Sequence, residues 1–147
     1  VGAVWHGVEY PGSEMIIHHG PAFRCLSEVQ YVEGGIVARL HVKANEELGG
    51  AREGSWISPM GIIDSSLFAC GILAWIRDPS MAAIPLGIES MSIVGTCNVG
   101  EQLFASIELK SFEKSKAIFD IDIRDQAGGC VALLRGFQAT LVSHNLG

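Results

Sequence analysis

The chain has 147 residues, of which 48% are hydrophobic, and its formal net charge is −6. This length predicts one domain with a substantial core. The acidic balance excludes a nucleic-acid partner, because phosphate binding needs clustered Lys and Arg. The longest apolar run contains an Asp and two serines, so we expect no transmembrane span and no membrane partner.

The four cysteines are far apart and form no CxxC pair: Cys25, Cys70, Cys97 and Cys130. Zinc and redox motifs need closely spaced cysteines, so this spacing predicts no metal site. We expect reduced, buried thiols in a cytoplasmic protein.

Residues 1–13 show no hydrophobic period and are interpreted as a linker, with a single domain over residues 14–147. The first residue is Val rather than Met, which predicts a fragment of a larger protein. In His18-His19-Gly20-Pro21 the proline fixes φ and predicts a turn. Two readings of the histidines stay open: they line a pocket as proton carriers or hydrogen-bond donors, or they end a strand.

Residues 29–32 and 36–43 flank Glu33-Gly34-Gly35 and predict a β-hairpin. The polar, glycine-rich residues 44–57 predict a loop. Residues 58–77 are almost continuously apolar, which predicts a helix of more than four turns that is buried on every face. Ser58 suits the cap of this helix and Pro59 its first position, and Pro79 ends it.

The remaining sequence predicts strands over residues 82–94, 102–110, 116–124 and 130–142. Pro85 within the first of them indicates an edge strand or a bulge. Two strands, one long helix and four further strands predict an α+β protein. We expect an antiparallel sheet wrapped around one long buried helix, which is the hotdog architecture; an ordinary α+β sandwich would give a similar pattern.

The most conspicuous candidate for chemistry is Asp64, the ionisable residue near the start of the apolar helix. Burial of a carboxyl group raises its pKa, and a helix N-terminus lowers it. Such a group can act as a catalytic acid. It can equally be a structural Asp that caps the helix or bonds the loop above it.

We expect the other polar residues with catalytic side-chain types to be solvent-exposed or structural rather than catalytic. Asp120 and Asp122 alternate with apolar residues, which predicts a solvated sheet face. We also expect His6, His41 and His144 to be solvated. Neither Ser65 nor Ser66 is accompanied by a His in sequence, so a nucleophilic serine is disfavoured.

Three segments, in this order, carry a family resemblance: His19-Gly20-Pro21-Ala22-Phe23-Arg24-Cys25-Leu26, the helix with Asp64, and Ile84-Pro85-Leu86-Gly87-Ile88-Glu89. Together they resemble the dehydratase domains of polyketide synthases, and the dehydratases of polyunsaturated fatty acid synthases, over roughly residues 14–143. Such domains are double hotdogs made of two fused halves. The sequence is similar to the C-terminal half.

The resemblance implies dehydration of a β-hydroxyacyl thioester to the α,β-enoyl form during polyketide or fatty acid assembly. The substrate would be carried on the phosphopantetheine of an acyl carrier protein, and no cofactor is needed. Asp64 would be the general acid, and a His of an N-terminal hotdog half would remove the α-proton. The implied substrate-binding residues are His19, Gly20, Pro21, Phe23, Phe68 and Pro85. The implied setting is a dimeric, multidomain synthase.

Two departures from the family pattern lead to the alternatives. The HxxxGxxxxP motif that carries the family's His is absent, so the chain alone is expected to be inactive. Phe68 stands four residues after Asp64, where the family commonly has Gln or His. One alternative is a homodimeric hotdog acyl thioesterase. The other is a non-catalytic half that holds the chain or acts as a scaffold in the synthase.

Overall fold

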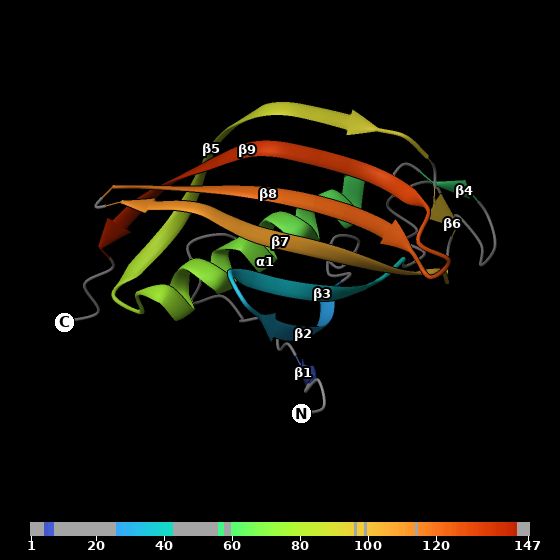
Figure 1. Ribbon diagram of the computed structural model, residues 1–147, viewed down its shortest axis with the longest axis horizontal. Helices are drawn as coiled ribbons and strands as arrows, with labels where there is room; N and C mark the ends of the chain where they lie inside the picture. The colour runs from blue at the N-terminus through green and yellow to red at the C-terminus, as the bar shows by residue number, and fades with distance from the viewer. Residues whose placement is uncertain are drawn as a thin grey trace.

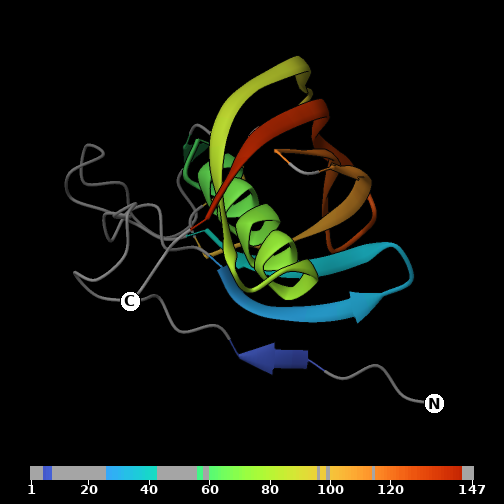
Figure 2. The same ribbon diagram turned by 90° about the vertical axis from the view of Figure 1, so that its left-hand side faces the viewer.

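The computed structural model describes residues 5–7, 26–42, 56–57, 60–95, 97–98, 100–113 and 115–143, with only the backbone at positions 56, 57, 60, 61 and 64. A seven-stranded antiparallel sheet curls around one helix (Figures 1 and 2). Its spatial order is β1 (Trp5–Gly7), β2 (Leu26–Val32), β3 (Gly35–His41), β7 (Gln102–Glu113), β8 (Lys116–Asp125), β9 (Cys130–Ser143) and β5 (Met81–Ile93). The helix, α1, runs from Met60 to Arg77.

Alternation along the strands creates the core. In β3, Ile36, Ala38 and Leu40 are fully buried, and their partners in β7 are Ile107, Ala105 and Leu103. Directly opposed residues share a face of the sheet. This face continues through β8, where Phe119, Ile121 and Ile123 are also fully buried. The concave face is therefore a continuous apolar surface, and α1 packs into it (Figure 2).

The apolar sequence of α1 has two distinct sides. Ile62, Ala69, Cys70 and Ala74 are at most 1% exposed. Leu67, Phe68 and Ile72 are only partly buried, and Trp75 is 54% exposed. In the described part of the molecule the helix is thus buried on its sheet side, rather than on every face as the sequence indicates.

Gly71 lies on the less buried side of α1, and a Cβ added there would meet no described atom within 4 Å apart from the nearby backbone of the helix itself. Glycine lowers the stability of a helix interior because it has the most backbone freedom to lose. We therefore expect Gly71→Ala to raise the free energy of unfolding by about 0.5 to 1 kcal/mol. Denaturant titration measures this difference, and an unchanged or lower stability would mean that the space is occupied.

Strand β5 confirms the interpretation of Pro85. It lies at one edge of the sheet and pairs only with β9 among the described strands. The pairing shifts register between Pro85 and Gly87, as a bulge does. A proline is accommodated here because an edge strand leaves part of its backbone unpaired.

Two short stretches depart from the expected elements. Residues 5–7, assigned above to a linker, form β1 and pair with β2. The Arg39 guanidinium lies 4.3 Å from the centroid of the Trp5 ring and also pairs with Glu28, which anchors the strand. Trp56 and Ile57, expected in a loop, form β4 and pair with β6 (Cys97–Asn98) in a separate two-stranded sheet.

Helix α1 and the strands beyond it lie where the sequence places them, within a few residues. The architecture is the predicted hotdog: an antiparallel sheet around one long central helix. Among the residues that the structure describes, no helix is long and apolar enough to cross a membrane.

Candidate functional site

The site is built around Asp64, the fifth residue of α1. Asp64 begins the second turn of this helix, and the first turn contains no acidic residue. The electrostatic effect of a helix terminus falls off within about one turn. The helix dipole therefore contributes less at this position than the sequence suggests. Asp64 is the only carboxylic acid in the sequence of α1.

The residues next to Asp64 pack into the interior of the protein. Ile63, Ser65 and Ser66 are buried. The Ser66 hydroxyl donates a hydrogen bond to the Ile62 carbonyl at 2.9 Å, so it is used within the helix. Burial raises the pKa of the Cys70 thiol well above its ordinary value, which keeps the thiol neutral and unreactive.

The buried side chains on the concave face of the sheet are apolar in the part of the chain that the structure describes. Among the described residues, only Ser65 and Ser66 are both buried and polar, and the rest of the buried set is apolar. None of the buried side chains in the described part of the sheet can therefore act as a base together with Asp64. His6 and His41 do not supply it, because both are exposed, as expected.

Two of the predicted substrate-binding residues are described. Phe68 lies in α1, one turn after Asp64, and packs partly buried against the core. Pro85 lies exposed in the edge strand β5. His19, Gly20, Pro21 and Phe23 lie outside the described residues, as do His18 and His144. The structure thus places Phe68 on the same helix as Asp64, and the substrate-binding roles of all six residues stay predictions.

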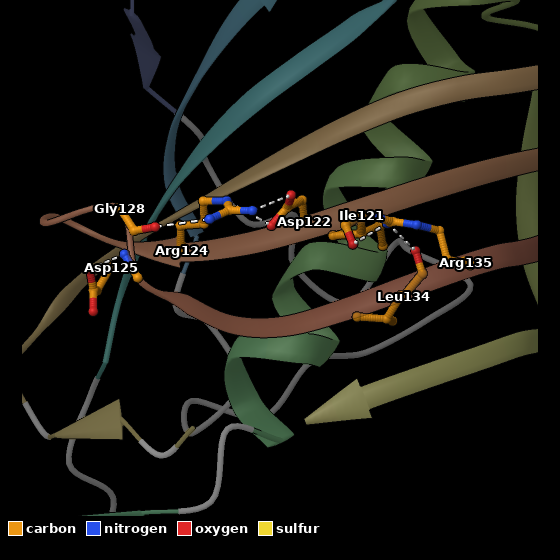
Figure 3. Close-up of polar contacts among 8 residues, drawn as sticks. Ile121, Asp122, Arg124, Asp125, Gly128, Leu134 and Arg135 are labelled. Atoms are coloured by element: carbon orange, nitrogen blue, oxygen red, sulfur yellow. Dashed lines mark hydrogen bonds and ion pairs between the residues drawn. The ribbon is translucent and has the colours of Figure 1, made fainter. Parts of the chain in front are cut away.

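The pair Asp120 and Asp122 lies on the outer face of the sheet, as expected. Figure 3 shows Asp122 paired with Arg124, at 3.1 Å between Oδ1 and Nε. Asp120 accepts a hydrogen bond from the Gly136 backbone amide at 3.0 Å, across a bulge between β8 and β9. Asp120 thus links β8 to β9, whereas the ion pair of Asp122 lies within β8.

A groove of about 390 Å³ lies on this outer face between the β2–β3 turn and Arg135. The Arg135 guanidinium donates to the backbone carbonyls of Ile121 and Leu134, both at 3.2 Å (Figure 3). The sheet separates this groove from α1. It is therefore not part of the candidate site around Asp64.

An exposed apolar surface on the concave side was not anticipated. Met91 is paired with Leu134 and Ile93 with Ala132, so both share the face of these buried residues. They nevertheless remain 45% and 48% exposed. The sequence signal was the lack of strict alternation in β5, which is typical of a strand covered on both faces.

An antiparallel sheet wrapped around one long helix defines the hotdog class of folds. The sequence matches the family model described as "Polyketide synthase dehydratase N-terminal domain" over residues 11–146. The chain belongs to the polyketide synthase dehydratase family. The description names an N-terminal domain, whereas the resemblance noted above points to the C-terminal half, and that assignment stays a prediction. A search of curated protein sequences finds no match.

Solved structures confirm the fold. The dehydratase domain from the CurJ module of curacin polyketide synthase is 22% identical, with a TM-score of 0.65. The match covers 86% of this chain but only 44% of the CurJ chain. A Streptococcus mutans protein bound to acetyl CoA is 14% identical over 89% of this chain and 99% of its own, with a TM-score of 0.65. A hypothetical thioesterase with coenzyme A from Streptococcus pneumoniae is 15% identical over 80% and 86%, with a TM-score of 0.61.

Proposed function

We propose that this chain is one hotdog half of a polyketide synthase dehydratase and that Asp64 is its catalytic acid. The observation that supports this most is the family match over residues 11–146, together with the placement of the only carboxylic acid of α1 near the start of the central helix. The substrate is a β-hydroxyacyl thioester on an acyl carrier protein, within a dimeric synthase.

The reaction needs one acid and one base. The thioester acidifies the α-carbon, and a His of the other hotdog half removes the α-proton. Asp64 gives its proton to the β-hydroxyl, and the bond between the β-carbon and oxygen breaks. Water leaves as the α,β double bond forms, so electrons and protons balance without a cofactor. The phosphopantetheine arm of the carrier protein brings the substrate.

The described surface supports a second half. Among the described residues, Met91 and Ile93 make the concave face apolar near the end of β5 and remain exposed there. A long edge strand with exposed apolar residues is a site for pairing with another sheet. The chain also spans less than half of the CurJ dehydratase that it matches, which leaves room in such a domain for a second unit.

We expect Met91→Lys and Ile93→Lys each to lower the free energy of unfolding of the intact domain by about 1 to 2 kcal/mol, because an ammonium group would be forced into a covered apolar face. Denaturant unfolding of the intact protein measures this. Val32→Lys is the matched control, since Val32 is 43% exposed and lies at the far hairpin. If all three variants behave alike, no second half covers this face.

The assay that tests the function uses the intact protein that contains this chain and a β-hydroxyacyl carrier protein. Mass spectrometry of the carrier should show the loss of one water with the thioester intact. Release of the free acid and the free thiol would instead support the homodimeric thioesterase. If neither product forms, the substrate remains bound or untouched, and the non-catalytic alternative replaces our proposal.

A further inference from the structure

Strand β1 lies at one edge of the sheet, beside β2 (Figure 1). It has only three residues, and their partners in β2 are Glu28, Val29 and Gln30. It is joined to β2 through residues 8–25 rather than through a tight turn. Ordering a residue costs more free energy than one backbone hydrogen bond contributes on balance. Side-chain contacts must therefore supply the difference that keeps β1 in place.

The main side-chain contact of β1 is a stack on the outer face of the sheet, which we call the Arg39 stack: Trp5, Arg39 and Phe104. Arg39 is directly opposed by Phe104 in β7 and by Glu28 in β2, so these residues share a face. The guanidinium carbon of Arg39 lies 4.3 Å from the centroid of the Trp5 ring and 6.0 Å from that of Phe104. Both distances are within the range of cation–π attraction.

The balance of free energy at Arg39 makes this contact reversible. Its Nη1 pairs with the Glu28 carboxylate, and its side chain is 26% exposed. Its Nε is buried and has no hydrogen-bond partner within the described part of the chain. An unpaired buried donor lowers the stability of the docked state. When the Trp5 ring leaves, water can reach the guanidinium, so part of the lost stacking is offset.

Strand β1 covers a segment that could otherwise pair with another chain. Without β1, β2 would be the edge of the described sheet on this side, with a row of unpaired N–H and C=O groups. Beside the covered residues, Tyr31 is 48% and Val32 is 43% exposed, and both residue types favour strands. Two copies of the same edge are self-complementary in an antiparallel, two-fold arrangement. A second copy of this chain therefore offers a matching edge.

We propose that β1 is a releasable strap over the edge of β2 and that the Arg39 stack is its latch. When the latch opens, the uncovered edge of β2 pairs with the same edge of a second copy of this chain. Docked β1 prevents this pairing, because a very short edge strand gives an incoming strand little backbone to bond. Local release of β1 is thus coupled to association of the protein.

The first test is Trp5→Ala in the intact protein, with hydrogen exchange read by mass spectrometry. We expect the amides of residues 28–30 to exchange about tenfold faster, the factor that corresponds to losing a partly desolvated cation–π contact. Peptides from β8 and β9 should keep their wild-type rates. Arg39→Lys keeps the charge but lacks the planar group that stacks, so it should speed exchange in the same residues. Leu86→Ala is the control, because Leu86 is 62% exposed in β5, at the opposite edge.

The second test is sedimentation velocity over a range of protein concentrations. Trp5→Ala should form a larger species than the wild type as its concentration rises, whereas Leu86→Ala should not. Adding Tyr31→Lys to Trp5→Ala should reverse this association, because a charged side chain on an edge strand opposes strand pairing.

The remaining outcomes would each overturn the inference. Unchanged exchange at residues 28–30 in both Trp5→Ala and Arg39→Lys would show that the stack is not a latch. Faster exchange throughout β8 and β9 would make β1 an integral part of the fold rather than a strap. Faster local exchange without association, or association that persists with Tyr31→Lys, would mean that the edge of β2 does not pair with a second copy. None of these measurements uses a substrate, so the proposed dehydratase function is tested separately.

Discussion

Replacing Asp64 with Asn should lower kcat for dehydration at least about 100-fold, because a positioned general acid contributes two to four orders of magnitude. Asn has nearly the same shape but no proton of suitable acidity to give to the departing hydroxyl. The loss should appear in kcat rather than in KM, since the acid acts mainly in the transition state. Single-turnover mass spectrometry of the carrier-bound product, on the intact protein, measures it.

Asp78→Asn is the matched control for this prediction. Asp78 follows the last residue of α1, and hydrogen bonds from Ser80 lower the pKa of its carboxyl group. The same chemical change at this end of the helix should leave turnover unaltered. Full activity in Asp64→Asn would remove Asp64 from the mechanism and return it to the role of a structural helix residue.

Replacing Gly35 with Ala should lower the free energy of unfolding by about 2 to 3 kcal/mol, the upper part of the range for overpacking a close contact. Built on the present backbone, the Cβ would overlap the Ile107 carbonyl oxygen, which is main chain and has no other rotamer. Strands β3 and β7 must then separate. The hydrogen bond from the Leu109 amide to the Gly34 carbonyl, now 3.0 Å, lies beside this contact. Denaturant unfolding monitored by circular dichroism gives the difference.

Substitutions at two other glycines serve as controls for this prediction. Gly34 has a φ of 79° and open space around it, so Gly34→Ala should cost about 1 to 2 kcal/mol for the left-handed backbone alone. Gly7 has neither constraint, so Gly7→Ala should stay within about 0.5 kcal/mol of the wild type. If Gly35→Ala changed the free energy of unfolding as little as Gly7→Ala does, β3 and β7 would not approach each other as closely at Gly35 as the structure shows.

Gly34 and Gly35 show which structural roles a local sequence pattern can predict and which it cannot. Glu33-Gly34-Gly35 predicts a turn between two strands, and the hairpin forms with the expected alternation at Ile36, Ala38 and Leu40. The two glycines nevertheless serve different ends. Gly34 supplies a positive φ, which turn statistics anticipate. Gly35 lets another strand approach, and that strand lies some seventy residues away in the sequence.

Some features of the candidate site are visible in the sequence, and others are visible only in the folded structure. The presence of one carboxylic acid in a long apolar helix is visible in the sequence, as is the family resemblance that gives it a role. The exposure of Met91 and Ile93 on the concave face is not visible, because it depends on how far α1 covers the sheet. The open space at Gly71 is likewise a property of the packed chain.

Hydrophobic period alone predicted the helix and most of the strands, because each period reflects one local geometry that the residues adopt on their own. The folded sheet distinguishes the expected hotdog from an ordinary α+β sandwich. Only the folded chain decided which side of α1 is buried and which groups the outward-facing Asp120 and Asp122 contact. It also decided which of several similar glycines is crowded by a distant strand. The physical reason is that burial and close approach are relations between segments far apart in sequence, and no local pattern encodes the partner.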